Sequence, residues 1–312
     1  MKDQPKISVL IALDDHSKPE ITMPSLTNQS TTDDYEIIIV NGNPRFRWEN
    51  RFKQATGSNP DHVTIRYFEI ENAGRASCWN LGVSKAKADF FLFFADDFSA
   101  ANQLVEEHIK FHNNDPSEFV VGIGPTFFPD SIRQTPFIRW LEDSGSLFGV
   151  SFTESPETNI ADTFFWGANA SMKRGLFYKT GKFDERFPYH AWDDYEFGLR
   201  LVEAGMRSRY LPDAISYHHH HINIAERMVT MRNAGQSAAI FERIRPGSWP
   251  WHATVGQKPL KLKILACYKR LRYLLFRREC MRWNSYQLFL DSAFSLGYRM
   301  EKQKDNGDHP VQ

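Results

Sequence analysis

The chain has 312 residues with 38 basic and 38 acidic side chains, and it is 41% hydrophobic and 14% aromatic. This content of apolar and aromatic side chains excludes global disorder, because it supplies enough surface to bury a sizeable core. A net charge of zero disfavours a nucleic-acid partner, which is usually matched by a basic excess. The charge is unevenly distributed, since residues 258–312 hold 12 basic and five acidic side chains, which leaves an acidic excess in residues 1–257.

The three cysteines are too few and too scattered for a disulfide framework or a four-cysteine zinc site. The first apolar stretch, residues 7–13, ends in two aspartates and lacks the small-residue exit of a cleavable signal. Because no window approaches about 18 uninterrupted apolar residues, we expect no membrane-spanning helix. These features favour a cytoplasmic protein, or one bound peripherally to the inner face of the plasma membrane.

Four near-continuous apolar or β-branched runs of strand length occur in the first hundred residues: 7–13, 35–40, 63–68 and 89–95. Such runs are typical of strands that are buried on both faces of a sheet. Residues 74–88 and 102–113 have helical spacing and follow the third and fourth runs. The alternation predicts an α/β, Rossmann-like fold with a mainly parallel central sheet flanked by helices.

The second half of the chain predicts a helix at 193–204, a strand at 214–217 and a helix at about 222–243. Residues 245–259 contain three prolines and two glycines, which is typical of a linker. We therefore predict a domain at 1–245, followed at 246–312 by a linker and a basic amphipathic helical extension.

Two acidic residues, Asp96 and Asp97, directly follow the fourth predicted strand. In open α/β sheets ligands bind beyond the carboxyl ends of the strands. Neighbouring carboxylates repel each other unless a cation offsets their charge, and Mg²⁺ or Mn²⁺ bound to a diphosphate would do so. The alternative is that these residues cap a helix beginning near Ser99.

Two further features have both a functional and a structural interpretation. The turn at 72–74 either brings backbone close to a ligand or is only a turn. Three acids, Asp193, Asp194 and Glu196, begin the predicted helix at 193–204. They either cap this helix, for which one carboxylate would suffice, or have a functional role.

Four consecutive histidines follow the predicted strand at 214–217. Alternation along an extended chain places His218 and His220 on one face, and His219 and His221 on the other. Imidazole is a common metal ligand, and if only one ring is a ligand, His218 is the best candidate. Incidental surface histidines are the alternative.

Taken in order, these segments resemble an inverting glycosyltransferase of family two with the GT-A fold, over residues 6–244. The motifs that carry the resemblance are ISVLIAL, EIIIVNGN, ENAGRASCWNLGVSKAKADFFLFFADD, FFWGANASMKRGLF, GKFDERF, WDDYEFGLRLVEAG and PDAISYHHH. The resemblance implies a nucleotide-diphospho-sugar donor, Mn²⁺ or Mg²⁺, and transfer of the sugar to a hydroxyl of a glycan or glycolipid. It further implies a hexosyltransferase that inverts the anomeric carbon and acts in surface polysaccharide or glycolipid synthesis.

The resemblance also implies residue roles. Asp97 and His218 would hold the metal, and Asp194, beside Asp193, would be the general base. The residues expected to bind the nucleotide sugar are Asn41, Asn72, Gly74, Asp96, Gly167 and Asn169. Ala95 replaces the first acid of the family's metal motif, so an alternative is a non-catalytic relative that binds nucleotide or glycan.

Residues 258–282 contain nine basic side chains and one acid, interleaved with leucines and aromatics. This pattern is typical of a helix that lies on an anionic membrane surface. The alternatives are a helix that packs on the catalytic domain, or on a second copy in a homodimer. A membrane-docked scaffold without catalytic activity is the remaining functional hypothesis.

Overall fold

The computed structural model describes residues 4–43, 45, 48–57, 59–71, 73–133, 135–148, 165–188, 191–248 and 283–305. The chain divides into two compact units, Met1–Glu185 with Asp193–His221, and Arg186–Trp192 with Ile222–Gln312. The domain boundary that we place at residue 245 remains a prediction. Asn72 and the basic stretch at 258–282 lie outside the described residues.

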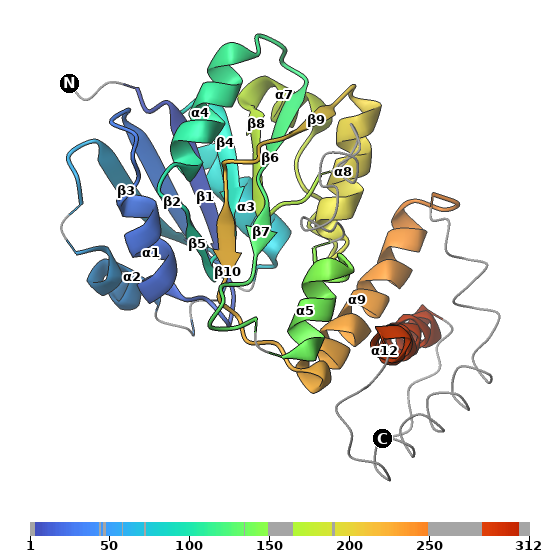
Figure 1. Cartoon of the computed structure of the whole chain (residues 1–312). Helices are drawn as coiled ribbons and strands as arrows, with labels where there is room; N and C mark the ends of the chain where they lie inside the picture. Colours follow the sequence, from blue (N-terminus) through green and yellow to red (C-terminus); the bar gives the residue numbers. More distant parts are fainter. Residues whose placement is uncertain are drawn as a thin grey trace. The chain divides into compact units, whose positions relative to one another are not determined.

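The first unit is built on a seven-stranded sheet with the order β3-β2-β1-β4-β8-β6-β9 (Figure 1). Its strands β1 to β4 are parallel, and β8 runs antiparallel to β4 and β6. The mainly parallel sheet and its first four strands are therefore confirmed. The strands are β1 (Ile7–Leu13), β2 (Tyr35–Asn41), β3 (Val63–Glu69), β4 (Phe90–Phe94), β6 (Val120–Ile123), β8 (Asn169–Lys173) and β9 (Arg207–Tyr210).

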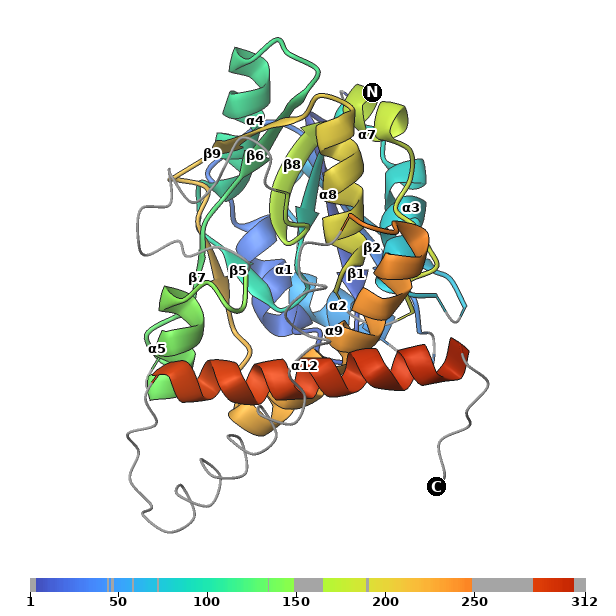
Figure 2. The same ribbon diagram turned by 90° about the vertical axis from the view of Figure 1, so that its right-hand side faces the viewer.

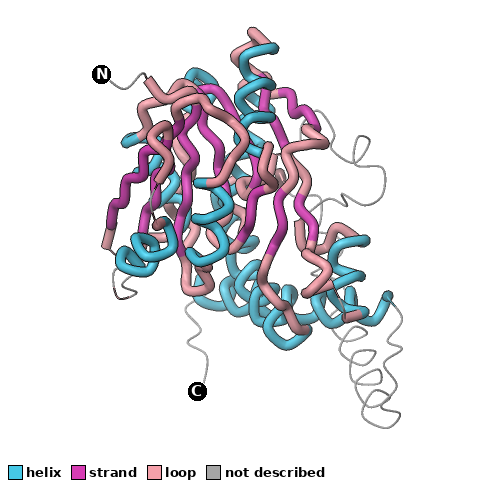
Figure 3. Tube along the Cα trace, turned by 60° about the vertical axis from the view of Figure 1, so that its left-hand side comes forward, coloured by secondary structure: helices cyan, strands magenta, loops and turns pink. Residues whose placement is uncertain are grey.

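Helices cover both faces of this sheet, with α3 and α7 on one face and α1 and α4 on the other (Figure 2). Every residue of β1 and β2 is buried, because both faces of these strands are covered. The helices of this unit are α1 (Pro19–Thr27), α2 (Trp48–Thr56), α3 (Arg75–Lys85), α4 (Leu104–Asn114), α5 (Pro136–Asp143), α7 (Arg174–Thr180) and α8 (Asp193–Glu203). In Figure 3, which is coloured by secondary structure, the strands of this unit run side by side with helices beside them.

A second, three-stranded sheet has the order β5-β10-β7 and consists of Phe98–Ala100, Ser216–His218 and Thr126–Phe127. The alternative that Asp96 and Asp97 cap a helix beginning near Ser99 is wrong, because residues 98–100 pair with β10 as an antiparallel strand and α4 begins only at Leu104. The Phe98 ring is buried and lies against Phe94 and His218, which anchors this strand in an aromatic cluster. Asp97 is therefore not a helix cap, and it directly precedes a strand that pairs with the histidine segment.

The second unit consists mainly of α9 (Ile224–Ile244) and α12 (Trp283–Asp305), which pack against each other. The two helices cross at paired glycines. A Cβ at Gly235 would lie 2.0 Å from the Phe294 carbonyl oxygen, and one at Gly297 would lie 1.8 Å from the Arg232 carbonyl oxygen. A C-terminal helix is thus present as expected, and among the described helices none is long and apolar enough to cross a membrane.

Candidate active site

The carboxyl ends of the adjacent parallel strands β1 and β4 bring acidic residues together at one edge of the sheet. The Oδ2 atom of Asp96 accepts hydrogen bonds from the Asp14 backbone N–H, at 2.9 Å, and from the Ser17 hydroxyl. The side chain is almost fully buried, and burial, with the charges of Asp14 and Asp97, raises the pKa of Asp96 well above its usual value. Asp96 therefore ties the segment after β1 to the end of β4.

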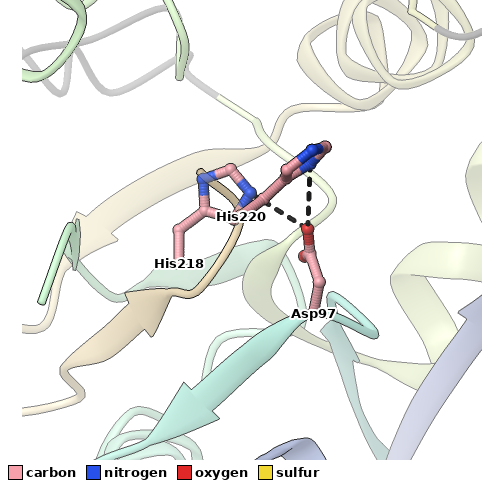
Figure 4. Close-up of side chains that lie close together, drawn as sticks. All are labelled: Asp97, His218 and His220. Carbon is pink, nitrogen blue, oxygen red and sulfur yellow. Dashed lines mark hydrogen bonds and ion pairs between the residues drawn. The ribbon is translucent and has the colours of Figure 1, made fainter. Parts of the chain in front are cut away.

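Asp97 faces two histidines of the segment that ends β10 (Figure 4). Its Oδ2 atom lies 3.0 Å from Nε2 of His218 and 3.9 Å from Nδ1 of His220. His219 turns the other way and hydrogen-bonds the Ser99 hydroxyl at 2.8 Å. The alternation predicted for His218 and His220 is confirmed. His220 therefore belongs to the same side-chain cluster, and it is not among the residues predicted from the sequence, although the alternation pointed to it.

Asp97, His218 and His220 each offer one ligand atom, and these atoms all lie within 4.8 Å of one another. Burial alone would raise the pKa of Asp97, but the hydrogen bond and charge of His218, with the charge of His220, hold it below its usual value. Phe98 and Phe128 lie against the His218 ring, so the site has an apolar wall. One carboxylate with two imidazoles fits a divalent cation that accepts both oxygen and nitrogen, such as Mn²⁺.

The acids that begin α8 lie in the same unit. Burial is the main cause that raises the pKa of Asp194 to about 7, and the neighbouring charge of Asp193 adds to it. Asp193 is buried as well, and burial raises its pKa too. A Cβ on Gly167 would lie 3.8 Å from the Asp194 Cβ, so the predicted donor loop borders the predicted base. At neutral pH the Asp194 carboxyl is near the midpoint of its titration, which suits a proton acceptor.

Arg75 supplies positive charge among these acids, and the sequence analysis did not select it. It is the first residue of α3, directly after Gly74 at the N-cap. Its Nη2 atom lies 3.0 Å from Asp14 Oδ2, and about a third of its side chain, 32%, is exposed. Burial opposes its charge, but Asp14, Asp96 and the other nearby carboxylates raise its pKa. A cation at a helix N-terminus opposes the helix dipole, and this mismatch is the signal that could have revealed it.

Two asparagines predicted to contact the donor are held within the fold. Asn41 ends β2 and is buried, and its Oδ1 atom accepts a hydrogen bond from the Asn43 backbone N–H at 3.0 Å. Asn169 begins β8 opposite Phe94 and is fully buried. Both residues lie at the edge of the sheet where β4 ends, but their amides bond other parts of the chain. Their roles in donor binding remain predictions.

The sequence matches two family models. The model described as "Glycosyl transferase family 2" matches residues 20–181, and the one described as "Glycosyl transferase family group 2" matches residues 119–246. Together they cover the segments that contribute Asp97, Asp194 and the histidines.

Characterised and uncharacterised relatives show the same likeness. The chain is 24% identical over 244 residues to an uncharacterised glycosyltransferase, YfnE, of Bacillus subtilis, covering 63% of this chain and 60% of that protein. It is 23% identical over 227 residues to the chondroitin synthase of Escherichia coli, covering 64% of this chain and 32% of the synthase. The chain thus spans less than two thirds of the length of either relative.

A solved structure is similar over almost the whole chain. It is a mannosyltransferase from Pyrobaculum calidifontis in complex with GDP-Man and Mn²⁺, with a TM-score of 0.61 and 14% sequence identity, covering 95% of this chain and 88% of that one. This likeness shows the fold, which is that of a GT-A glycosyltransferase. Because a family model matches more than half of the sequence and the fold agrees with it, the chain belongs to glycosyl transferase family 2.

Proposed function

We propose that the protein transfers a hexose from a nucleotide-diphospho-sugar to a hydroxyl of a glycan or glycolipid, with inversion at the anomeric carbon and with Mn²⁺ or Mg²⁺ as cofactor. The observation that carries the proposal is the Asp97–His218–His220 cluster at the edge of the sheet where ligands bind in open α/β folds. The neighbouring mannosyltransferase structure, which contains GDP-Man and Mn²⁺, supports a nucleotide-sugar donor and a divalent cation.

The chemistry assigns a part to each group. A sugar hydroxyl is a poor nucleophile, so Asp194 would accept its proton as the oxygen attacks. Asp97, His218 and His220 would hold the cation, which when bound stabilises the charge on the departing nucleoside diphosphate. Attack from the face opposite the leaving group inverts the anomeric carbon without a covalent enzyme intermediate. Arg75 would add positive charge beside the acids that surround the diphosphate.

A panel of nucleotide sugars tests the proposed activity directly. The full chain is incubated with each donor and with Mn²⁺ or Mg²⁺, and the released nucleoside diphosphate is measured. We expect release from a subset of the donors, and only when a divalent cation is present. Absence of turnover together with calorimetric binding of UDP, GDP or dTDP would instead support the non-catalytic alternative. Absence of both would contradict each of these functions.

The role of Asp194 as the base can be tested by its replacement and by the pH dependence of transfer. Asp194→Asn keeps the volume but removes the proton acceptor, so we expect transfer to fall by about 10²-fold or more. In the wild-type protein the carboxyl protonates as pH falls through its pKa of about 7. Transfer should therefore fall by about tenfold for each pH unit below that value. The exposed Asp213→Asn is the control, and near-normal transfer by Asp194→Asn would refute the assignment.

Removal of one imidazole tests the metal site. His220→Ala removes a nitrogen that lies 3.9 Å from Asp97 Oδ2, and we expect the dissociation constant for Mn²⁺ to rise by about tenfold or more. His219→Ala is the matched control, because its ring bonds Ser99 on the opposite side. Quantifying free Mn²⁺ by electron paramagnetic resonance gives both affinities. Equal affinities in the two variants would exclude His220 as a ligand.

We also propose that the basic stretch at 258–282 attaches the protein to the anionic inner face of the plasma membrane. Its nine basic residues would contribute about 1 kcal/mol each when they lie near such a surface. The full chain should float with anionic vesicles at low salt and not with neutral ones. Flotation should weaken in a variant with Gln at Lys261, Lys263, Arg270 and Arg272. No flotation, with a dimer in light scattering, would favour contact with a second copy.

A further inference from the structure

Asn169 bonds to a part of the chain that lies outside its own sheet. It begins β8 in the seven-stranded sheet, but its Nδ2 atom donates to the carbonyl oxygen of Ala214 at 2.8 Å and to that of Pro125 at 3.3 Å. The same atom lies 3.2 Å from the Ser216 hydroxyl. Ser216 is the first residue of β10, so one buried amide links the large sheet to the small one.

The strand that receives this link is short. Residues 216–218 of β10 pair with three residues of β5 and two of β7. The ladder itself is therefore short, and it is supplemented by single backbone bonds, from the Ser216 N–H to the Pro125 carbonyl and from the His219 N–H to the Asp97 carbonyl. His218 ends this strand and His220 follows two residues later, so an error in the placement of Ser216 would displace both imidazoles relative to Asp97.

A chain of side-chain hydrogen bonds fixes which way the amide points. The Asn169 Oδ1 atom can only accept, so the His108 Nε2–H must donate to it, across 3.1 Å. The other ring nitrogen of His108 then accepts from the Ser171 hydroxyl at 2.7 Å. Ser171 in turn accepts from the Nε2–H of His112 at 2.8 Å. With Oδ1 engaged in this way, the amide N–H groups face the backbone oxygens of Pro125 and Ala214.

Burial keeps the two histidines of this hydrogen-bond series in one protonation state. It lowers the pKa of His108 to about 4, and it lowers that of His112 to about 3. Both rings are therefore neutral at physiological pH, and each has one donor and one acceptor nitrogen. The orientation of the Asn169 amide follows from these neutral rings and from the oxygens around its Nδ2 atom.

We propose that Asn169 is a positioning residue whose amide, oriented by His108, places β10 so that the rings of His218 and His220 face Asp97. This inference rests on the metal site of the proposed function. It gives Asn169 a role without contact to the donor, which agrees with its complete burial. Residues that orient metal ligands typically change metal affinity by about 10- to 100-fold when they are replaced.

The isosteric substitution Asn169→Asp removes the N–H donors of the amide and keeps its acceptor oxygen. The new carboxyl can still accept from His108, but its second oxygen faces the carbonyl oxygens of Ala214 and Pro125. We expect Mn²⁺ affinity to fall by about tenfold or more, although Asp97, His218 and His220 are all retained. Asn80→Asp is the matched control, because the buried Asn80 amide likewise donates to a backbone carbonyl oxygen, that of Phe183 at 3.0 Å, but does not bond β10.

The experiment uses the full chain with Mn²⁺ alone. Electron paramagnetic resonance gives the affinity, and the ¹⁴N modulation of the electron spin echo reports imidazoles bound to the ion. We expect Asn169→Asp to lose affinity and ¹⁴N modulation, and Asn80→Asp to stay within about threefold of wild type. His108→Phe, which leaves the amide without its orienting donor, should show a smaller loss of the same sign and serves if Asn169→Asp does not fold.

The possible outcomes separate the two proposals. Wild-type affinity and modulation in Asn169→Asp, or in His108→Phe where the first variant does not fold, would overturn the positioning role and leave the metal site standing. Equal losses in Asn80→Asp and Asn169→Asp would also overturn it, because the effect would then be a general destabilisation. A wild-type chain that binds no Mn²⁺ would overturn both the positioning role and the metal dependence of the proposed function.

Discussion

The site depends on how buried carboxylates are compensated by positive charge. Asp96 is buried and Asp97 and Asp194 are partly buried, yet the pKa is raised in Asp96 and Asp194 and lowered in Asp97. Burial raises the pKa of Asp96 and Asp194, whereas at Asp97 the hydrogen bond and charge of His218, with the charge of His220, outweigh the effect of burial. Environments that drive identical groups apart in pKa are typical of sites that need both a ligand and a proton acceptor.

Each of the two sheets positions different residues of this site. The large parallel sheet brings Asp14 and Asp96 to one edge, because adjacent parallel strands end together. The small sheet brings the histidines to Asp97, because β10 pairs with β5. The first arrangement is held by strands that are buried on both faces, whereas the second is held by three-residue strands and by the Asn169 amide. A short strand that carries the proposed metal ligands thus depends on side-chain bonds that a longer strand would not need.

Much of the large sheet could be predicted from sequence, because long apolar runs such as residues 35–40 have no alternative to burial on both faces. The strand β5 could not, since a three-residue strand has too few positions to show a period and forms only through its distant partner β10. The direction of β8 is likewise set by long-range pairing with β4 and β6. In the site, alternation predicted that His218 and His220 share a face, but their approach to Asp97 depends on tertiary pairing and has no local signature, whereas Arg75 had only the weak signal of a cation at a helix N-terminus.

The acidic excess of residues 1–257 now has a physical consequence for the proposed donor. A diphosphate beside Asp97 would lie near a carboxylate whose lowered pKa keeps it charged, while Arg75 supplies a guanidinium group among the acids of the site. Like charges at a few ångströms in a partly buried site repel by several kcal/mol. A divalent cation beside Asp97 reverses the sign of this interaction for the phosphate oxygens. The negative charge of the site therefore gives a second reason, beside the Asp97–His218–His220 cluster, for the proposed metal dependence.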